Sequence, residues 1–143
     1  MSEPLLSLLD EVRRCWHVLL AAGERLHAEE PVTMGMRAVL EQLSRFGPAT
    51  VPSVARARGV SRQHVQTLVN PLAALGLVRF EDNPASRRSP LVALTREGRL
   101  MFRRMKRAEA GLLMPVAKAC PASEWRQAAA TLRKLRLSLE ARP

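Results

Sequence analysis

The stretch Pro52–Leu68, PSVARARGVSRQHVQTL, decides how the centre of the chain folds. Ala55 is small enough to let two helices approach closely, and Gly59, four positions later, suits the left-handed stop of the first helix. The hydroxyl of Ser61 can cap a second helix, and Val65 lies where it can anchor that helix on the first. A helix–turn–helix requires small, turn-forming and anchoring residues at this spacing, so we predict one here.

The second of these helices is apolar on one side and polar on the other. With about 100° between successive residues, one face collects Val65, Leu68, Val69, Leu72 and Leu75. The opposite face, with its cap and margin, contains no acid, and we predict that DNA is contacted by Ser61, Arg62, Gln63, Gln66, Thr67 and Asn70. Gln and Asn can pair with adenine, and Thr can meet a thymine methyl group or a phosphate. An ordinary solvated face usually mixes Glu with Lys, so this face favours insertion into a major groove.

Two short strands follow the helix–turn–helix. Leu77–Phe80 and Leu91–Leu94 have the apolar character of strands, and the polar segment Glu81–Pro90 between them is typical of a hairpin loop. A hairpin that follows a DNA-reading helix is a wing, and its tip can reach the neighbouring minor groove. Arginine suits that groove because its charge meets a focused negative potential. We therefore predict that Arg87 and Arg88 bind DNA, with a basic, solvated turn as the alternative.

Helices are also predicted before this central region. The segment Leu5–Leu26 has an apolar seam at steps of three and four, formed by Leu5, Leu8, Val12, Cys15, Leu19, Ala22 and Leu26. Such a seam is typical of helices that pack along their length, and an ordinary core face of the same subunit explains it equally well. Thr33 can cap a further helix that ends near Phe46.

Within the second helix of the helix–turn–helix, we expect Pro71 to cause a kink.

Two more helices are predicted after the hairpin. Thr95 starts a long helix that we expect to continue to about Lys118, with a kink at Pro115. A last helix opens at Cys120 and carries a second apolar seam, formed by Trp125, Ala128, Leu132, Leu135 and Leu139.

Positive charge is the strongest global property of this chain of 143 residues. It contains 23 Lys and Arg residues against 13 Asp and Glu residues, which gives a net charge of +10. Such an excess attracts polyanions, of which nucleic acids are the commonest in a cell. An anionic membrane surface and a merely basic solvated surface are the alternatives. Hydrophobic residues make up 47% of the chain and aromatic residues only 3%, which predicts an aliphatic core.

Several classes of protein and site are disfavoured. No run approaches the roughly 18 apolar residues that span a bilayer, and the N-terminal residues lack the basic segment of a secretory signal, so we expect a cytoplasmic protein. Cys15 and Cys120 are too few for a disulfide framework, and the three His residues do not cluster, so we predict no metal site. We find no nucleophile–base constellation, no phosphate loop and no paired carboxylates. The sequence thus predicts neither an enzyme nor a cofactor.

Three stretches carry a resemblance to one family of regulators. They are Val60–Val65, the hairpin entry Leu75–Val78, and Arg87–Arg99, in which the most specific motif is Leu94-Thr95-x-x-Gly98. Together they resemble the MarR family of bacterial winged helix–turn–helix regulators, and the order of predicted elements is similar over the whole chain.

The resemblance implies a mainly α fold with a small β wing. Residues 31–97 would form the winged helix–turn–helix DNA-binding domain, and residues 1–30 and 98–143 the helical dimerisation region. It also implies a bacterial, nucleoid-associated homodimer that offers two winged domains to a palindromic double-stranded DNA operator. Many such proteins are repressors released by a small, often aromatic, ligand between the lobes, and the same is expected here. The candidate ligand-binding residues are Trp16, His17, Met36 and Arg37.

One departure from the family's pattern concerns the wing. The family usually carries an acid two residues before the minor-groove arginine, and the acid braces that arginine. Arg88 matches the arginine, but Ser86 occupies the acid's place. We consider Asp82, at the end of the first strand, as a substitute for the acid.

Two alternative functions remain open at the level of sequence. One branch of the family senses hydroperoxides through a first-helix cysteine that tyrosines activate; Cys15 lies on the first helix, and Cys120 could pair with it across subunits, but the chain contains no Tyr. On the apolar seam, Cys15 is also explained as a small hydrophobic residue. The other alternative is a winged-helix protein-interaction module whose basic surface meets an acidic partner.

Overall fold

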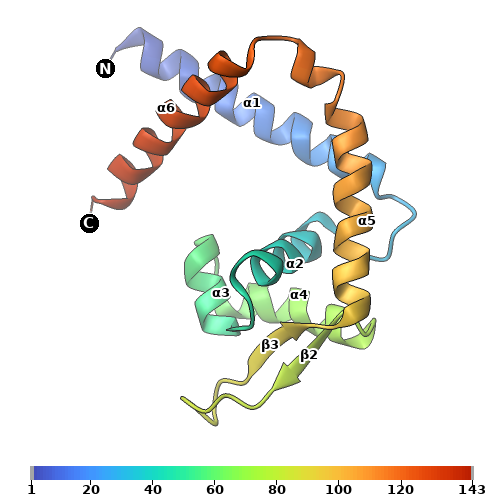
Figure 1. The fold of residues 1–143 in the computed structure, drawn as a ribbon. Coiled ribbons are helices and arrows are strands. Elements are labelled where there is room, and N and C mark those ends of the chain that lie inside the picture. The colour runs from blue at the N-terminus through green and yellow to red at the C-terminus, as the bar shows by residue number, and fades with distance from the viewer. Residues whose placement is uncertain (1, 143) are drawn as a thin grey trace. The chain divides into compact units, whose positions relative to one another are not determined.

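The computed structural model describes residues 2–142 and confirms a mainly α fold with a small β wing (Figure 1). Within this range the helices are α1 (Glu3–Leu26), α2 (Met34–Phe46), α3 (Val51–Arg58), α4 (Arg62–Ala74), α5 (Arg96–Leu113) and α6 (Ala122–Glu140), with a short 3-10 helix η1 (Val116–Lys118). The strands are β1 (Ala49–Thr50), β2 (Val78–Glu81) and β3 (Leu91–Leu94). The chain forms two compact units, of which the larger ends at Arg107 and the smaller begins at Ala108.

The helix–turn–helix lies where the sequence predicts it, as α3 and α4. Before α3, the Thr50 hydroxyl oxygen accepts a hydrogen bond from the Ser53 amide at 3.2 Å. α3 ends at Gly59, whose φ of 64° is a left-handed conformation that residues with a side chain rarely adopt. Before α4, Oγ of Ser61 accepts a hydrogen bond from the His64 amide at 3.0 Å. The turn is therefore bounded by a glycine stop on one side and a serine cap on the other.

α4 passes through Pro71 without interruption and ends at Ala74. Proline cannot donate a hydrogen bond to the carbonyl oxygen four residues earlier, which here belongs to Thr67. The helix nevertheless continues because Val69 and Leu72, on either side of the proline, are both fully buried. The proline interrupts one hydrogen bond and not the helix.

The wing is part of a three-stranded antiparallel sheet with the strand order β1–β3–β2. β2 and β3 pair from Val78 opposite Leu94 to Glu81 opposite Leu91, so residues 82–90 form the hairpin loop. This hairpin projects away from α2, α3 and α4 in Figure 1. The sequence did not predict β1, because a strand of two residues has no recognisable periodicity and exists only through its pairing with β3.

The Leu94-Thr95-x-x-Gly98 motif joins the sheet to α5. The Thr95 hydroxyl donates to the Gly76 carbonyl oxygen at 2.6 Å and accepts from the Gly98 amide at 3.0 Å. The Thr95 amide donates to the Leu77 carbonyl oxygen at 3.1 Å. A Cβ atom on Gly98 would collide with that same carbonyl group. The threonine and the glycine thus hold the first turn of α5 directly against the entry to β2.

The core of the larger unit is aliphatic, as the composition predicts. The apolar face predicted on α4 is buried at Val65, Val69 and Leu72, whereas Leu75 is 43% exposed at the helix end. The core comprises Val32, Met36, Val39, Leu40, Leu43, Val54, Ala55, Val65, Val69, Leu72, Leu77, Val78, Val92, Leu94, Phe102 and Met105.

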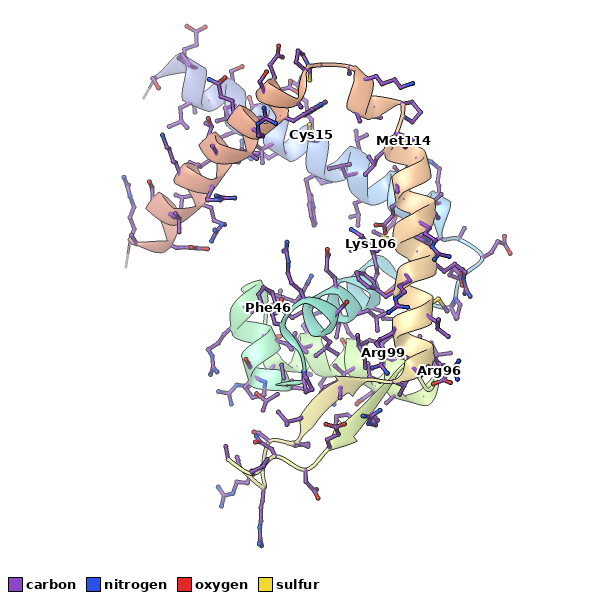
Figure 2. The ribbon with its side chains drawn as sticks, in the orientation of Figure 1. Cys15, Phe46, Arg96, Arg99, Lys106 and Met114 are labelled. Atoms are coloured by element: carbon purple, nitrogen blue, oxygen red, sulfur yellow. The ribbon has the colours of Figure 1, made fainter. Side chains whose placement is uncertain are left out.

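The prediction of one helix from Thr95 to Lys118 with a kink at Pro115 was wrong. α5 ends at Leu113, and η1 follows as a separate 3-10 helix. Pro115 lacks the amide that would continue the helix. Met114, labelled in Figure 2, is exposed, so its side chain does not offset the hydrogen bond that Pro115 cannot make.

The apolar seams of the first and last helices are largely exposed. α1 buries only Gly23, and α6 buries none of its described residues. Within its unit, the seam of α1 is therefore not an ordinary core face, and Cys15 on that helix is exposed (Figure 2). Among the described residues no helix is both long and apolar enough to cross a membrane.

Candidate DNA-binding surface

The polar face of α4 is exposed and lies opposite the buried face of the same helix. Arg62, Gln63, Thr67 and Asn70 are exposed, and Gln66 is half-buried. The core contacts of the opposite face hold α4 in place, so these side chains project from a rigid element. The structure brings the predicted α4 residues together on one acid-free surface.

Hydrogen bonds organise part of this face. Nε2 of Gln66 donates to Oδ1 of Asn70 at 2.6 Å, one helical turn away. The Thr67 hydroxyl donates to the His64 carbonyl oxygen at 2.6 Å. Gln66 and Asn70 therefore form a pair with free donor and acceptor positions left on each amide. Thr67 keeps its methyl group and its oxygen lone pairs for a contact.

A hollow of about 350 Å³ joins α4 to the wing. Residues from three elements and the hairpin loop line it: Val51, Pro52, Arg62, Gln63, Gln66, Phe80, Arg88, Ser89 and Pro90. The sequence places Arg62 and Arg88 in different elements, and the tertiary fold brings them to one hollow. Phe80, which is 45% exposed, was not among the residues predicted from the sequence. The one sequence signal for it is that it is an aromatic residue in a chain with very few.

The wing arginines are exposed and carry no counter-ion. Across residues 2–142, neither Arg87 nor Arg88 forms an ion pair. Asp82, considered as a substitute brace, does not pair with Arg88. The neighbouring acid Glu81 is engaged by Arg79 at 2.6 Å. Both positive charges of the wing tip are therefore available to an anionic partner.

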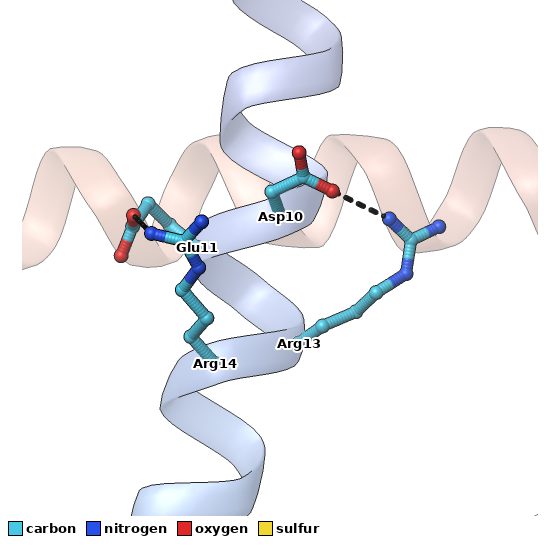
Figure 3. A network of polar contacts seen from close by, with 4 residues as sticks. All are labelled: Asp10, Glu11, Arg13 and Arg14. Atoms are coloured by element: carbon cyan, nitrogen blue, oxygen red, sulfur yellow. Dashed lines mark hydrogen bonds and ion pairs between the residues drawn. The ribbon is translucent and has the colours of Figure 1, made fainter.

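Two further ion pairs lie on α1, outside the elements that carry the predicted contact residues. On α1, Arg13 pairs with Asp10 at 3.0 Å and Arg14 with Glu11 at 3.3 Å (Figure 3). Exposed pairs of this kind contribute little to stability, because water and salt screen them.

One ion pair ties the connection between α1 and α2 to α5. Oε1 and Oε2 of Glu30 accept hydrogen bonds from Nε and Nη2 of Arg104 at 2.9 and 2.7 Å. The hydrogen bond from Arg104 lowers the pKa of Glu30, and the same contact raises the pKa of Arg104. This two-pronged geometry links residues 74 positions apart in the larger unit.

The candidate ligand-binding residues differ widely in their surroundings. Trp16 and His17 are exposed on α1, whereas Met36 belongs to the core. Arg37 pairs with Glu41 at 2.8 Å and lies 5.5 Å from the centre of the Phe102 ring. A hollow of about 300 Å³ surrounds the connection between α1 and α2, and none of these four residues lines it. Their role in ligand binding stays a prediction.

Both cysteines are free thiols. Cys15 on α1 is exposed, and Cys120 is half-buried before α6. The interpretation of Cys15 as a small hydrophobic residue on the apolar seam stays a prediction, because its side chain is exposed in the single chain. The redox-sensing alternative stays a prediction.

Comparison with known proteins finds a family model that matches the centre of the chain. The family model described as "MarR family" matches residues 37–89, which include the helix–turn–helix and most of the wing loop. The uncharacterized protein Rv2011c of Mycobacterium tuberculosis is 37% identical over 99 residues, which cover 69% of this chain and 68% of that protein.

Solved structures extend the similarity over nearly the whole chain. The MarR family transcription regulator SP03579 is 25% identical with a TM-score of 0.84, covering 99% of this chain and 95% of that one. BldR from Sulfolobus solfataricus (20% identity, TM-score 0.80, 98% and 99% covered) has the same fold. BpsR of Bordetella bronchiseptica also has this fold, with 23% identity and a TM-score of 0.76 over 89% of this chain and 91% of that one. Proteins of the matched family are DNA-binding regulators and not enzymes. This chain belongs to the MarR family of transcription regulators.

Proposed function

We propose that the protein is a homodimeric, sequence-specific repressor that a small-molecule ligand releases from its operator. The observation that carries this proposal is the acid-free face of α4, which opens onto the same hollow as Arg88. Lysine and arginine contacts to phosphates supply affinity, side chains of α4 read base edges in the major groove, and the wing enters the adjacent minor groove.

Exposed apolar side chains support the proposed dimer. Trp16 and Leu19 on α1 are 62% and 57% exposed, and Leu132 and Leu139 on the predicted seam of α6 are 40% and 59% exposed. Leaving many large apolar side chains in water is unfavourable, and contiguous exposed apolar surface usually marks an interface. A second copy of the chain would cover these helices and offer a second α4 to a palindromic operator.

A similar protein supports the proposed ligand response. The DNA binding of BpsR is regulated by 6-hydroxynicotinic acid. By analogy we propose a small aromatic acid as the ligand of this protein. A thermal-shift screen with such acids tests this, because a ligand that binds the native state raises the melting temperature. No shift with any member of a broad aromatic-acid set would contradict the proposed ligand class.

A gel-shift experiment tests the proposed DNA binding. The purified protein is titrated against the promoter fragment upstream of its own gene, with excess random duplex as competitor. We expect selective retention of the promoter fragment. Arg88→Ala should weaken binding and lower the slope of log affinity against log salt concentration by roughly 1.

Arg126→Ala is the matched control for that experiment. It removes the same charge from an exposed residue of α6, outside the predicted contact surface, and should leave the salt slope unchanged. Equal affinity for promoter and random DNA would contradict sequence-specific regulation. Failure to bind any DNA, together with capture of an acidic protein, would favour the protein-interaction module.

A further inference from the structure

The carboxamide of Asn83 spans the neck of the wing loop. Its Nδ2 donates to the Ser89 carbonyl oxygen at 2.8 Å, and its Oδ1 accepts from the Ala85 amide at 3.1 Å. Its own carbonyl oxygen accepts from the Ser86 amide at 3.1 Å. We call these three hydrogen bonds the Asn83 clasp. They connect the start of the loop to its middle and to the residue that follows Arg88.

Each atom of the clasp matches the chemistry of asparagine. Pro84 occupies the second position of the turn from Asn83 to Ser86, where its fixed φ is favourable. The side-chain oxygen faces an amide, and the side-chain nitrogen faces a carbonyl oxygen, so only one orientation of the carboxamide satisfies both contacts. Aspartate could accept a hydrogen bond from the Ala85 amide but could not donate to Ser89. Alanine could make neither side-chain contact, although its backbone carbonyl could still accept from the Ser86 amide.

The clasp fixes the backbone on both sides of the arginines without adding charge. Ala85 and Ser86 precede Arg87 and Arg88, and Ser89 follows them, so the clasp restrains five consecutive loop residues. An acid in the place of Ser86 would hold an arginine by direct contact, but it would also cancel one of the two positive charges that phosphates attract. A neutral amide that restrains the backbone leaves both charges on the wing.

We propose that Asn83 is the positioning residue of the wing, and that its uncharged clasp holds the loop backbone so that Arg88 is presented to the minor groove. This proposal rests on the proposed function, because it requires the wing to contact DNA. A positioning role predicts that Asn83 matters for DNA binding only through the arginine it positions. It also predicts little effect on global stability, because the loop tip lies outside the core.

The two neighbouring residues provide a charge-matched test. In the swapped variant Asp82→Asn/Asn83→Asp, composition and net charge are unchanged, but the side-chain donor to Ser89 is lost. Asn83→Ala removes both side-chain contacts, and Asp82→Asn leaves the clasp intact. We expect the swapped variant and Asn83→Ala to bind the promoter fragment about 3- to 10-fold more weakly at equal melting temperature, the factor that one hydrogen bond is worth. Asp82→Asn should bind at least as tightly as the parent.

A double-mutant cycle separates positioning from a general structural effect. In an Arg88→Ala background, Asn83→Ala should cause no further loss of affinity, because the residue being positioned is absent. Additive losses would overturn the proposal, as would unchanged affinity in both the swapped variant and Asn83→Ala.

Hydrogen exchange measures the clasp in the absence of DNA. The Ala85 amide, which donates to the Asn83 side chain, should exchange more slowly in the parent than in Asn83→Ala. Equal exchange rates of this amide in the two proteins would overturn the clasp itself. Slow amide exchange in the parent, together with no DNA binding by the parent or any variant, would contradict the proposed function and the positioning role of Asn83. The same result would still support the Asn83 clasp as a structural feature.

Discussion

Single residues set the boundaries of the elements that carry the candidate site. Gly59 ends α3 in a left-handed conformation, and Ser61 caps α4 two residues later, so the turn between the helices is short. Thr95 holds the start of α5 against the entry to β2 by hydrogen bonds to the Gly76 and Leu77 carbonyl oxygens, and Gly98 permits the close approach because it has no side chain. Both features are visible in the sequence, because the residue types are the ones that these conformations require.

Gly98 gives a prediction about close packing. Gly98→Ala should lower the free energy of unfolding by about 1–3 kcal/mol, because its Cβ would collide with the rigid Leu77 backbone. Chemical denaturation measures the change. Gly111→Ala is the control on the same helix: nothing lies within 4 Å of its Cβ position, so it should raise stability by about 0.5–1 kcal/mol. Equal effects at the two sites would contradict the packing explanation.

Gln66 gives a prediction about sequence reading. Gln66→Ala should reduce the ratio of operator affinity to affinity for a base-substituted operator by roughly 5- to 100-fold, the discrimination that one bidentate base contact provides. Binding to random DNA should change much less. Competition titrations at one fixed salt concentration give both values, with the exposed α6 variant Gln127→Ala as control. A uniform loss across all duplexes would place Gln66 on phosphates and not on bases.

At the scale of elements, tertiary context decided what local patterns left open. Pro71 lies in α4 and Pro115 lies beyond α5, yet only the second ends a helix. Flanking Val69 and Leu72 are fully buried, so packing holds α4 together across the missing hydrogen bond. Met114 and Val116 are 67% and 51% exposed, so nothing offsets the loss at Pro115. Loss of one backbone hydrogen bond at a proline therefore leaves α4 continuous where the neighbours are buried, but coincides with the end of α5 where the neighbours are exposed.

The link between Glu30 and α5 gives a prediction about pH. Because Arg104 lowers the pKa of Glu30 in the folded state, the pair stabilises the fold above the unfolded-state pKa and loses this contribution as pH falls through the folded-state pKa. Glu30→Gln should therefore be slightly less stable than the parent at neutral pH and equally stable in acid. Denaturation midpoints across the acidic range test this, with Glu29→Gln as the neighbouring control. A difference that persists in strong acid would exclude the ion pair as its cause.

At the scale of the whole molecule, the exposed apolar seams are the main unexplained surface of a single chain. α6 has no buried residue among those described, so packing within its own unit does not account for its amphipathic pattern. The predicted functional division into residues 31–97 and the two terminal regions stays a proposal. The compact units divide the chain at a different point, after Arg107, because packing groups α1 and most of α5 with the winged domain.

The seam of α6 gives a prediction about assembly. Leu132→Glu should raise the dimer dissociation constant at least about 10-fold, because burying an unpaired carboxylate costs more than the 1.4 kcal/mol that a tenfold change represents. Light scattering across a dilution series measures the assembly state. Gln127→Glu adds the same charge to α6 outside the seam and should leave the state unchanged. A monomeric parent protein, or a dimer insensitive to Leu132→Glu, would contradict the proposed interface.

The sequence by itself determined the helix–turn–helix, the hairpin with its two arginines, and the core face and acid-free face of α4. Each depends on local periodicity or on a residue with a particular backbone preference. Only the tertiary structure decided the pairing of β1, the end of α5, the hollow shared by Arg62 and Arg88, and the Asn83 clasp. Each of these depends on contacts between groups that the fold brings together, and the spacing of residues along the chain does not specify those contacts.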